Sequence, residues 1–134
     1  MNKTYRVHCD CGTVHLEMTG EPHIRAFCHC EDCRDLLDVP YHSINAWEGD
    51  RVSVLRGEDE VGVYAHPTLD MTRVFCKACG ESLYNTNAMG WKLVSQLLIA
   101  KRNGGQLPEA LRSNAHFFYD RRIVDIEDEI AKPT

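Results

Sequence analysis

The seven cysteines of this 134-residue chain all lie in three short clusters. The clusters read Cys9-x-Cys11, Cys28-His29-Cys30-x-x-Cys33 and Cys76-x-x-Cys79. Disulfides alone cannot consume an odd number of cysteines, and thiolates at such short spacings are typical zinc ligands. Structural zinc takes four protein ligands, whereas catalytic zinc takes three and keeps one position open. Seven cysteines therefore divide naturally into one closed site and one open site.

The closed site is expected to combine the first and third clusters. Cys76 and Cys79 precede Gly80, and a glycine there lets the backbone double back as in a zinc knuckle. Cys9 and Cys11 point to the same side of an extended segment, because side chains in strands repeat with a period of two. The alternatives are reduced cysteines without metal and a redox pair. A redox pair would need a βαβ context, which the sequence does not indicate.

The middle cluster offers three thiolates, Cys28, Cys30 and Cys33, within six residues. Three sulfurs fill three corners of a tetrahedron and leave one open, and a thiol or water bound at that corner would lose its proton near neutral pH. The alternative is a second structural site with a histidine as its fourth ligand. The candidates for that ligand are His29, His8, His23, His42 and His66. A metal held by both Cys28 and Cys30 would lie on the face of the chain opposite to the His29 side chain, so His29 cannot easily be its fourth ligand.

Short alternating segments, separated by Gly, Pro or Asp, predict a mainly antiparallel β chain. The expected strands cover residues 14–18, 41–47, 51–55, 61–65, 71–75, 82–84 and 116–119. Periodicity does not decide between strand and helix over 92–100, and 108–112 has the proline start of a helical turn. The length predicts one domain over 1–134, with a tail over 125–134 that either frays or caps it.

Charge and termini narrow the possible partners. The formal net charge is −5 and the basic residues are scattered, which argues against nucleic-acid binding because affinity for phosphates comes from clustered Lys and Arg. The first residues contain no apolar signal region, and the longest apolar run is too short for a bilayer, so no membrane segment is expected. Dense free thiols without an export signal indicate the cytoplasm.

The complete pattern resembles the glutathione-dependent formaldehyde-activating enzyme family, which is also called the centromere protein V-like family. The resemblance spans about residues 5–128 and includes all seven cysteines in order and spacing. The matching motifs are Cys9-x-Cys11-Gly12, Cys28-His29-Cys30-x-x-Cys33-Arg34, Phe75-Cys76-x-x-Cys79-Gly80 and His116-x-x-x-x-Arg121.

The resemblance implies an Mss4-like fold of several coiled antiparallel β-sheets and two zinc ions per chain. Cys9, Cys11, Cys76 and Cys79 would hold the structural ion, and Cys28, Cys30 and Cys33 the catalytic one. It also implies a carbon–sulfur lyase, similar to an S-(hydroxymethyl)glutathione synthase, that joins a small-molecule thiol such as glutathione to a small aldehyde such as formaldehyde, or reverses the reaction. His29 is the candidate general acid nearest in sequence to the open site.

One segment departs from the family. Residues 35–40 are bulkier and more acidic than the small, glycine-containing stretch of many relatives. We expect them to flank the open zinc corner, where an acidic lip would repel the two carboxylates of glutathione. Arg34, or else Arg73 or Lys77, would offset that repulsion. The alternative functions are a non-catalytic zinc module that binds a protein partner and a thiol redox or zinc-buffering protein.

Overall fold

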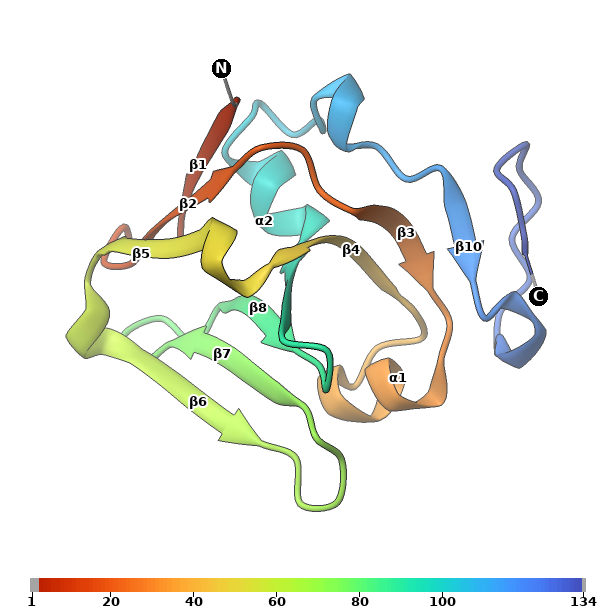
Figure 1. Cartoon of the computed structure of the whole chain (residues 1–134), viewed down its shortest axis with the longest axis horizontal. Helices are drawn as coiled ribbons and strands as arrows, with labels where there is room; N and C mark the ends of the chain where they lie inside the picture. Colours follow the sequence, from red (N-terminus) through yellow and green to blue (C-terminus); the bar gives the residue numbers. More distant parts are fainter. Residues whose placement is uncertain (1–2, 134) are drawn as a thin grey trace.

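The computed structural model describes residues 3–133, and ten strands in two sheets form most of that part of the chain. The smaller sheet is antiparallel and has the order β1 (Thr4–His8), β2 (His15–Thr19), β5 (Val52–Arg56). The larger sheet has the order β10 (Ala115–Phe117), β3 (Ile24–Cys28), β4 (His42–Glu48), β9 (Trp91–Ser95), β8 (Ser82–Thr86), β7 (Thr72–Cys76), β6 (Val61–Ala65). Figure 1 shows β10 and β6 at its two edges. This arrangement confirms the predicted mainly β, Mss4-like fold class.

Short helices connect the strands. The α-helices are α1 (Glu31–Leu37) and α2 (Gln96–Lys101), and the 3₁₀ helices are η1 (Gly49–Arg51), η2 (Glu58–Glu60), η3 (Glu109–Leu111) and η4 (Tyr119–Arg121). The undecided segment 92–100 divides at Ser95, where β9 ends and α2 begins. The Ser95 hydroxyl accepts a hydrogen bond from the backbone N–H of Leu97 at 3.2 Å, which caps the helix. Serine at this position therefore marks the change from strand to helix.

The main core lies between the two sheets and α2. Strand β2 alternates strictly, with Leu16 and Met18 fully buried on one face, as a sheet with one solvated face requires. Trp47 of β4 and Leu98 of α2 are buried in the same cluster. The indole N–H of Trp47 donates to the backbone carbonyl of Gly20 at 2.9 Å, so burying this large ring leaves no polar atom unpaired.

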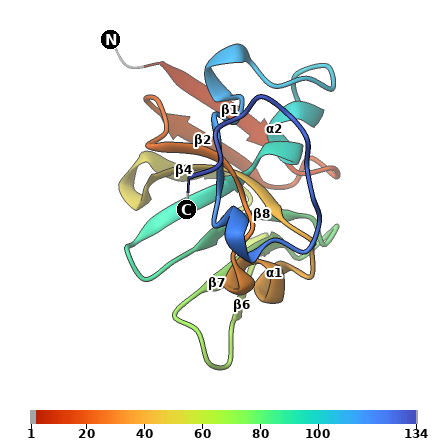
Figure 2. The same ribbon diagram turned by 90° about the vertical axis from the view of Figure 1, so that its right-hand side faces the viewer.

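The tail folds back against the larger sheet. Ala131 forms a bridge with Ala115, and the Tyr119 hydroxyl accepts from the backbone N–H of Ile126 at 2.7 Å and donates to its carbonyl at 3.1 Å. Figure 2 shows the segment after β10 covering one side of the molecule, above α1. We expected the tail either to fray or to cap the domain, and the described part of the tail caps it.

The structure adds elements that the sequence pattern did not indicate. Strands β1 and β3 and helix α1 were not predicted, and β10 pairs with β3 in parallel. None of the helices in residues 3–133 is long and apolar enough to cross a membrane. The cytoplasmic location stays a prediction from the cysteine content.

Candidate metal centres and the adjoining pocket

The first metal centre is formed by Cys9, Cys11, Cys76 and Cys79, whose sulfurs all lie within 4.8 Å of one another. The Cys9 and Cys11 sulfurs are 3.5 Å apart, and those of Cys11 and Cys76 are 3.8 Å apart. A tetrahedral zinc site with bonds of about 2.3 Å places its sulfurs roughly 3.8 Å from each other. The four thiols therefore fit a closed zinc site, as the sequence predicted.

This centre joins the two sheets. Cys9 directly follows β1 of the smaller sheet, and Cys76 ends β7 of the larger one. A left-handed glycine follows each cysteine pair, Gly12 with φ 76° and Gly80 with φ 81°. Their backbone N–H groups return to the carbonyls of Cys9 and Cys76 at 2.9 and 2.7 Å, so each loop curls its two sulfurs toward one point. Side chains other than glycine adopt this conformation rarely.

An ion-pair network ties both cysteine loops to the end of α2. Lys101 binds Asp10 at 2.9 Å and also pairs with Glu81, while Arg102 binds Asp10 at 2.9 Å. Asp10 lies between the first two cysteines, and Glu81 follows Gly80. Because these groups are partly exposed, each pair adds little stability by itself. The network does place two cations beside a site whose four thiolates would exceed the charge of one zinc.

The second centre is formed by Cys28 at the end of β3, Cys30 before α1 and Cys33 in its first turn. Their sulfurs also lie within 4.8 Å of one another, and among the described residues no histidine nitrogen or carboxylate oxygen joins them at that distance. None of the five histidines considered as a fourth ligand is therefore in place. Three thiols with no fourth protein ligand suit an open zinc site.

Local hydrogen bonds favour the thiolate of one cysteine in this cluster and raise the pKa of the Cys28 and Cys33 thiols. The Cys28 thiol donates to the Cys30 sulfur at 3.3 Å, and the backbone N–H of Cys33 donates to the same sulfur at 3.3 Å. Hydrogen bonds from the thiols of Cys28 and Cys33 lower the pKa of the Cys30 thiol well below its ordinary value. Of the three thiols, Cys30 is therefore the one whose thiolate, the form that ligates metals, is most favoured.

Two buried histidines lie behind this centre. His29 and His116 are both fully buried, their Nε2 and Nδ1 atoms are 3.0 Å apart, and His116 Nε2 lies 2.9 Å from an Asp128 carboxylate oxygen. A carboxylate only accepts, so a neutral His116 donates from Nε2 and accepts from His29. Burial is the main cause that lowers the pKa of His29, and a protonated His116 would lower it further. His29 also stacks on Tyr41 with ring centroids 5.1 Å apart.

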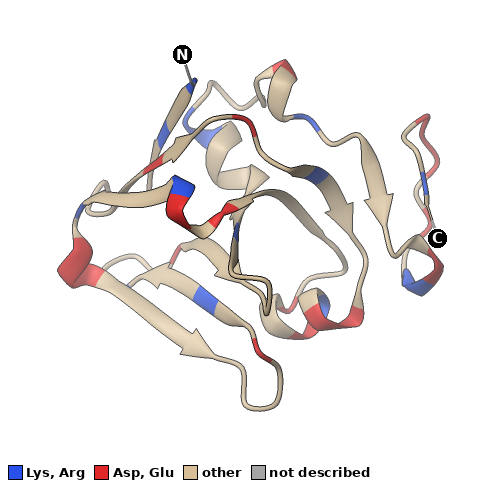
Figure 3. Cartoon of the chain, in the orientation of Figure 1, with Lys and Arg blue, Asp and Glu red and all other residues tan. Residues whose placement is uncertain are grey.

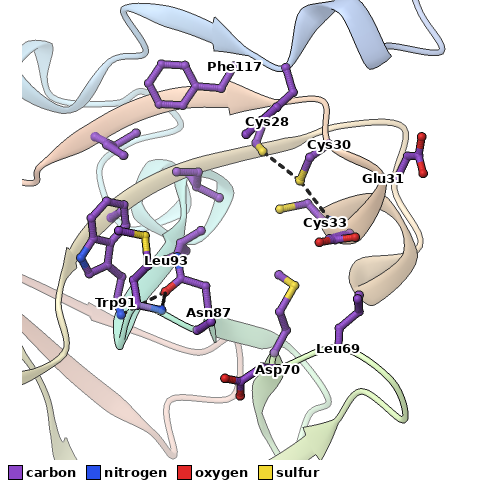
Figure 4. A pocket seen from close by; sticks show the side chains of 18 of the residues that line it. Cys28, Cys30, Glu31, Cys33, Leu69, Asp70, Asn87, Trp91, Leu93 and Phe117 are labelled. Atoms are coloured by element: carbon purple, nitrogen blue, oxygen red, sulfur yellow. Dashed lines mark hydrogen bonds between the residues drawn. The ribbon is translucent and has the colours of Figure 1, made fainter.

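A pocket of about 670 Å³ opens beside the second centre, and Cys28, Cys30 and Cys33 form part of its wall. Figure 4 shows the three sulfurs on one side of this space, with Trp91 and Leu93 across from them. The remaining walls come from β3, β4, the 69–71 segment, the β8–β9 turn and the residues after β10. The open side of the candidate zinc site therefore faces a space large enough for a small organic molecule.

The predicted site residues are only partly in this pocket. His29 and Arg34 are not among its lining residues, and the Nε2 atom of His29 is occupied by His116. The acidic segment 35–40 does not flank the open corner, which corrects that expectation: Asp35 lies one turn further along α1 and contacts His66 at 2.6 Å. The acidic lining residues are instead Glu31, Asp32 and Asp70.

The structure also adds residues that were not singled out as site residues. Arg121, which was noted only as the last position of a motif, is the one cation among the described residues that line the pocket. Phe117 and Phe118 were expected only as part of the strand over 116–119, and Trp91 lies just before the undecided segment 92–100. The only local sign that these residues belong to the site was the position of Phe117 and Phe118 directly after His116. The order of the strands along the chain does not indicate that residues 91 and 118 lie near Cys30.

Comparison with known proteins agrees with the motifs. The chain is 34% identical over 80 residues to an uncharacterized lyase of Schizosaccharomyces pombe; the match covers 60% of this chain and 56% of that relative. A crystal structure of a Rhodobacter sphaeroides protein shares the fold, with a TM-score of 0.54 and 19% identity, covering 77% of this chain and 97% of that one. The family model described as glutathione-dependent formaldehyde-activating enzyme matches residues 4–121. The chain belongs to this family.

Proposed function

We propose that the protein is a carbon–sulfur lyase that adds a small thiol to a small aldehyde, or reverses that addition, in the pocket beside Cys28, Cys30 and Cys33. In the forward direction the sulfur forms a bond to the carbonyl carbon while the C=O π bond breaks. The proton lost by the thiol ends on the new hydroxyl group of the S-hydroxyalkyl product. The observation that supports this proposal best is a set of three clustered thiols in a pocket wall, without a fourth protein ligand among the described residues.

The three cysteines fit zinc by donor type and spacing, and a zinc ion there would stabilise the thiolate form of a thiol at neutral pH. The chain itself contributes the proximity of the two reactants. The pocket holds both reactants together, which replaces an encounter in water by a step within one complex. Together with the closed centre, this gives two zinc ions per chain.

We assign two supporting roles to residues around the open centre. Arg121 lines the pocket and can donate a hydrogen bond to the aldehyde oxygen as negative charge develops there. The proton itself then passes through solvent, because Arg121 stays protonated. His29, which is fully buried between its two cysteine neighbours, acts as a positioning residue: it fixes the segment that carries Cys28 and Cys30. The general-acid role expected for His29 is thereby replaced in this proposal.

The test uses the zinc-loaded protein, formaldehyde and a small thiol, with the exchange between free thiol and adduct followed by NMR. Cys30→Ser should remove the catalysed exchange and lower the zinc content from two ions per chain to one. Arg121→Gln should slow the exchange by about tenfold or more, whereas Arg56→Gln should not. Arg56 is an exposed arginine in the other sheet and is the matched control. A folded Cys30→Ser variant with unchanged exchange contradicts the proposal.

A further inference from the structure

The pocket beside the open centre is mainly apolar. Away from the cysteines, its apolar walls include Ile24, Ile44, Trp91, Leu93, Phe117 and Phe118. Ile44 and Leu93 are buried and pack together, with Ile24 and Trp91 partly buried against them. In Figure 4, Trp91 and Leu93 lie across from the three sulfurs, and Phe117 lies beside Cys28. Together the apolar lining residues give the pocket a largely apolar surface. A surface of this kind favours an apolar group by removing it from water.

Two of the apolar side chains that line the pocket are largely exposed. Phe118 is 53% exposed and Met89 is 66% exposed, although both line the pocket. Phe118 also has a left-handed backbone, with φ 56°, which is strained for a bulky residue. Strain of this kind is concentrated at ligand-binding positions. Phe118 is therefore an exposed aromatic ring, held at a strained backbone position, in the wall of the pocket.

The charges around the pocket oppose an anionic ligand. Glu31, Asp32 and Asp70 line it, and the first turn of α1 that carries Glu31 and Asp32 is acidic in Figure 3. The one lining cation, Arg121, lies 3.7 Å from the Glu31 carboxylate, so part of its charge is already balanced. Arg34, expected to receive glutathione, is outside the lining. Glutathione carries two carboxylates at neutral pH, and this pocket offers them little compensation.

We propose that the thiol accepted by this site carries an uncharged aryl or alkyl arm rather than the charged tripeptide arm of glutathione, which has two carboxylates and one ammonium group. The sulfur lies toward Cys28, Cys30 and Cys33, and the arm lies along Trp91 and Phe118. This inference rests on the proposed function, because it names the substrate class of the same pocket. The same apolar arm would be present on the S-hydroxyalkyl compound in the reverse direction.

Binding to the zinc-loaded chain tests the inference without any turnover. Benzyl mercaptan and glutathione are titrated separately by calorimetry, and quenching of tryptophan fluorescence reports contact with Trp91. We expect benzyl mercaptan to bind at least about tenfold more tightly than glutathione, since tenfold corresponds to about 1.4 kcal/mol and a buried phenyl ring supplies more than that. Glutathione binding equal to or tighter than that of benzyl mercaptan would overturn the inference and leave the proposed function standing. Failure of both thiols to bind would overturn both proposals.

Variants separate the apolar contact from the charge effect. Phe118→Gly should weaken benzyl mercaptan binding by about tenfold while the melting temperature stays equal or rises, because glycine relieves the left-handed strain. Met89→Ala should weaken it less, and Leu97→Ala, which removes a 70% exposed side chain on α2, should leave it unchanged. Glu31→Gln should strengthen glutathione binding and not that of benzyl mercaptan. Phe118→Gly that binds benzyl mercaptan as well as the native chain refutes the placement of the arm.

Discussion

The two cysteine centres should differ sharply in what they contribute to stability. The first centre connects Cys11 to Cys76, 65 residues apart, and so closes a long loop between two sheets. The second connects Cys28 to Cys33 and closes a loop of only a few residues within one strand–helix junction. Chain-entropy reasoning for a cross-link gives about 4 kcal/mol for a loop of roughly 65 residues and about 2 kcal/mol for a loop of roughly 5.

Matched double variants test this difference. Cys76→Ser/Cys79→Ser removes the knuckle ligands of the first centre, and Cys30→Ser/Cys33→Ser removes two ligands of the second. We expect the first pair of substitutions to lower the free energy of unfolding by about 4 kcal/mol or more, and the second by about 2 kcal/mol or less. Each variant should bind one zinc ion per chain. The first is expected to be near the limit of folding, because single domains have only about 5–15 kcal/mol of stability.

The assay is equilibrium unfolding in guanidinium with a slight excess of zinc, followed by two optical probes to establish two-state behaviour, with elemental analysis of zinc on each protein. Native protein treated with a strong chelator is the control and should lose at least as much stability as the knuckle variant. Equal losses in the two double variants, or a larger loss at the second centre, would refute the loop-closure reasoning.

Two further predictions concern the buried histidine pair. His116→Phe keeps a ring at this position but leaves the buried His29 N–H without an acceptor, so we expect the free energy of unfolding to fall by about 1–3 kcal/mol. Denaturant titration measures this loss, and the zinc content should not change. If the free energy of unfolding does not fall, the 3.0 Å contact between the two histidines contributes nothing to stability. Hydrogen bonds from Lys132, then from His116, lower the pKa of Asp128 from 3.8 to about 2, so this carboxylate stabilises the fold above pH 3.8 and its contribution should fall as the pH drops from about 4 to about 2. Comparing acid unfolding of the native chain with Asp128→Asn measures it, and superimposable curves would contradict the assignment.

The grouping of the cysteines could be predicted from sequence because they come in pairs and triplets. Cys76 and Cys79, or Cys28 and Cys30, are close in space whatever the rest of the fold does, and only the pairing of clusters requires tertiary structure. Glycines at 12 and 80 gave a second local signal, which their left-handed backbones confirm. Short-range geometry therefore carried most of that prediction.

The pocket could not be predicted in this way, because its walls meet only through the strand order. Strand β10 pairs with β3 across about 90 residues of chain, and β9 pairs with β4 across about 50. These long-range pairings bring Phe117 beside Cys28 and Trp91 toward Ile44. The parallel pairing of β10 also places His116 next to His29, a contact for which the two isolated histidines gave no local signal.

The acidic residues at the pocket differ from those expected, because helix α1 was not predicted from the sequence. Residues 35–37 belong to α1, which Cys30 caps, so the helix sets the directions in which their side chains point. Asp35 is thereby turned to His66, while Glu31 and Asp32, at the start of the helix, reach the pocket. The expected negative lip is present, but different residues form it, so the repulsion expected for the two carboxylates of glutathione now comes from Glu31, Asp32 and Asp70.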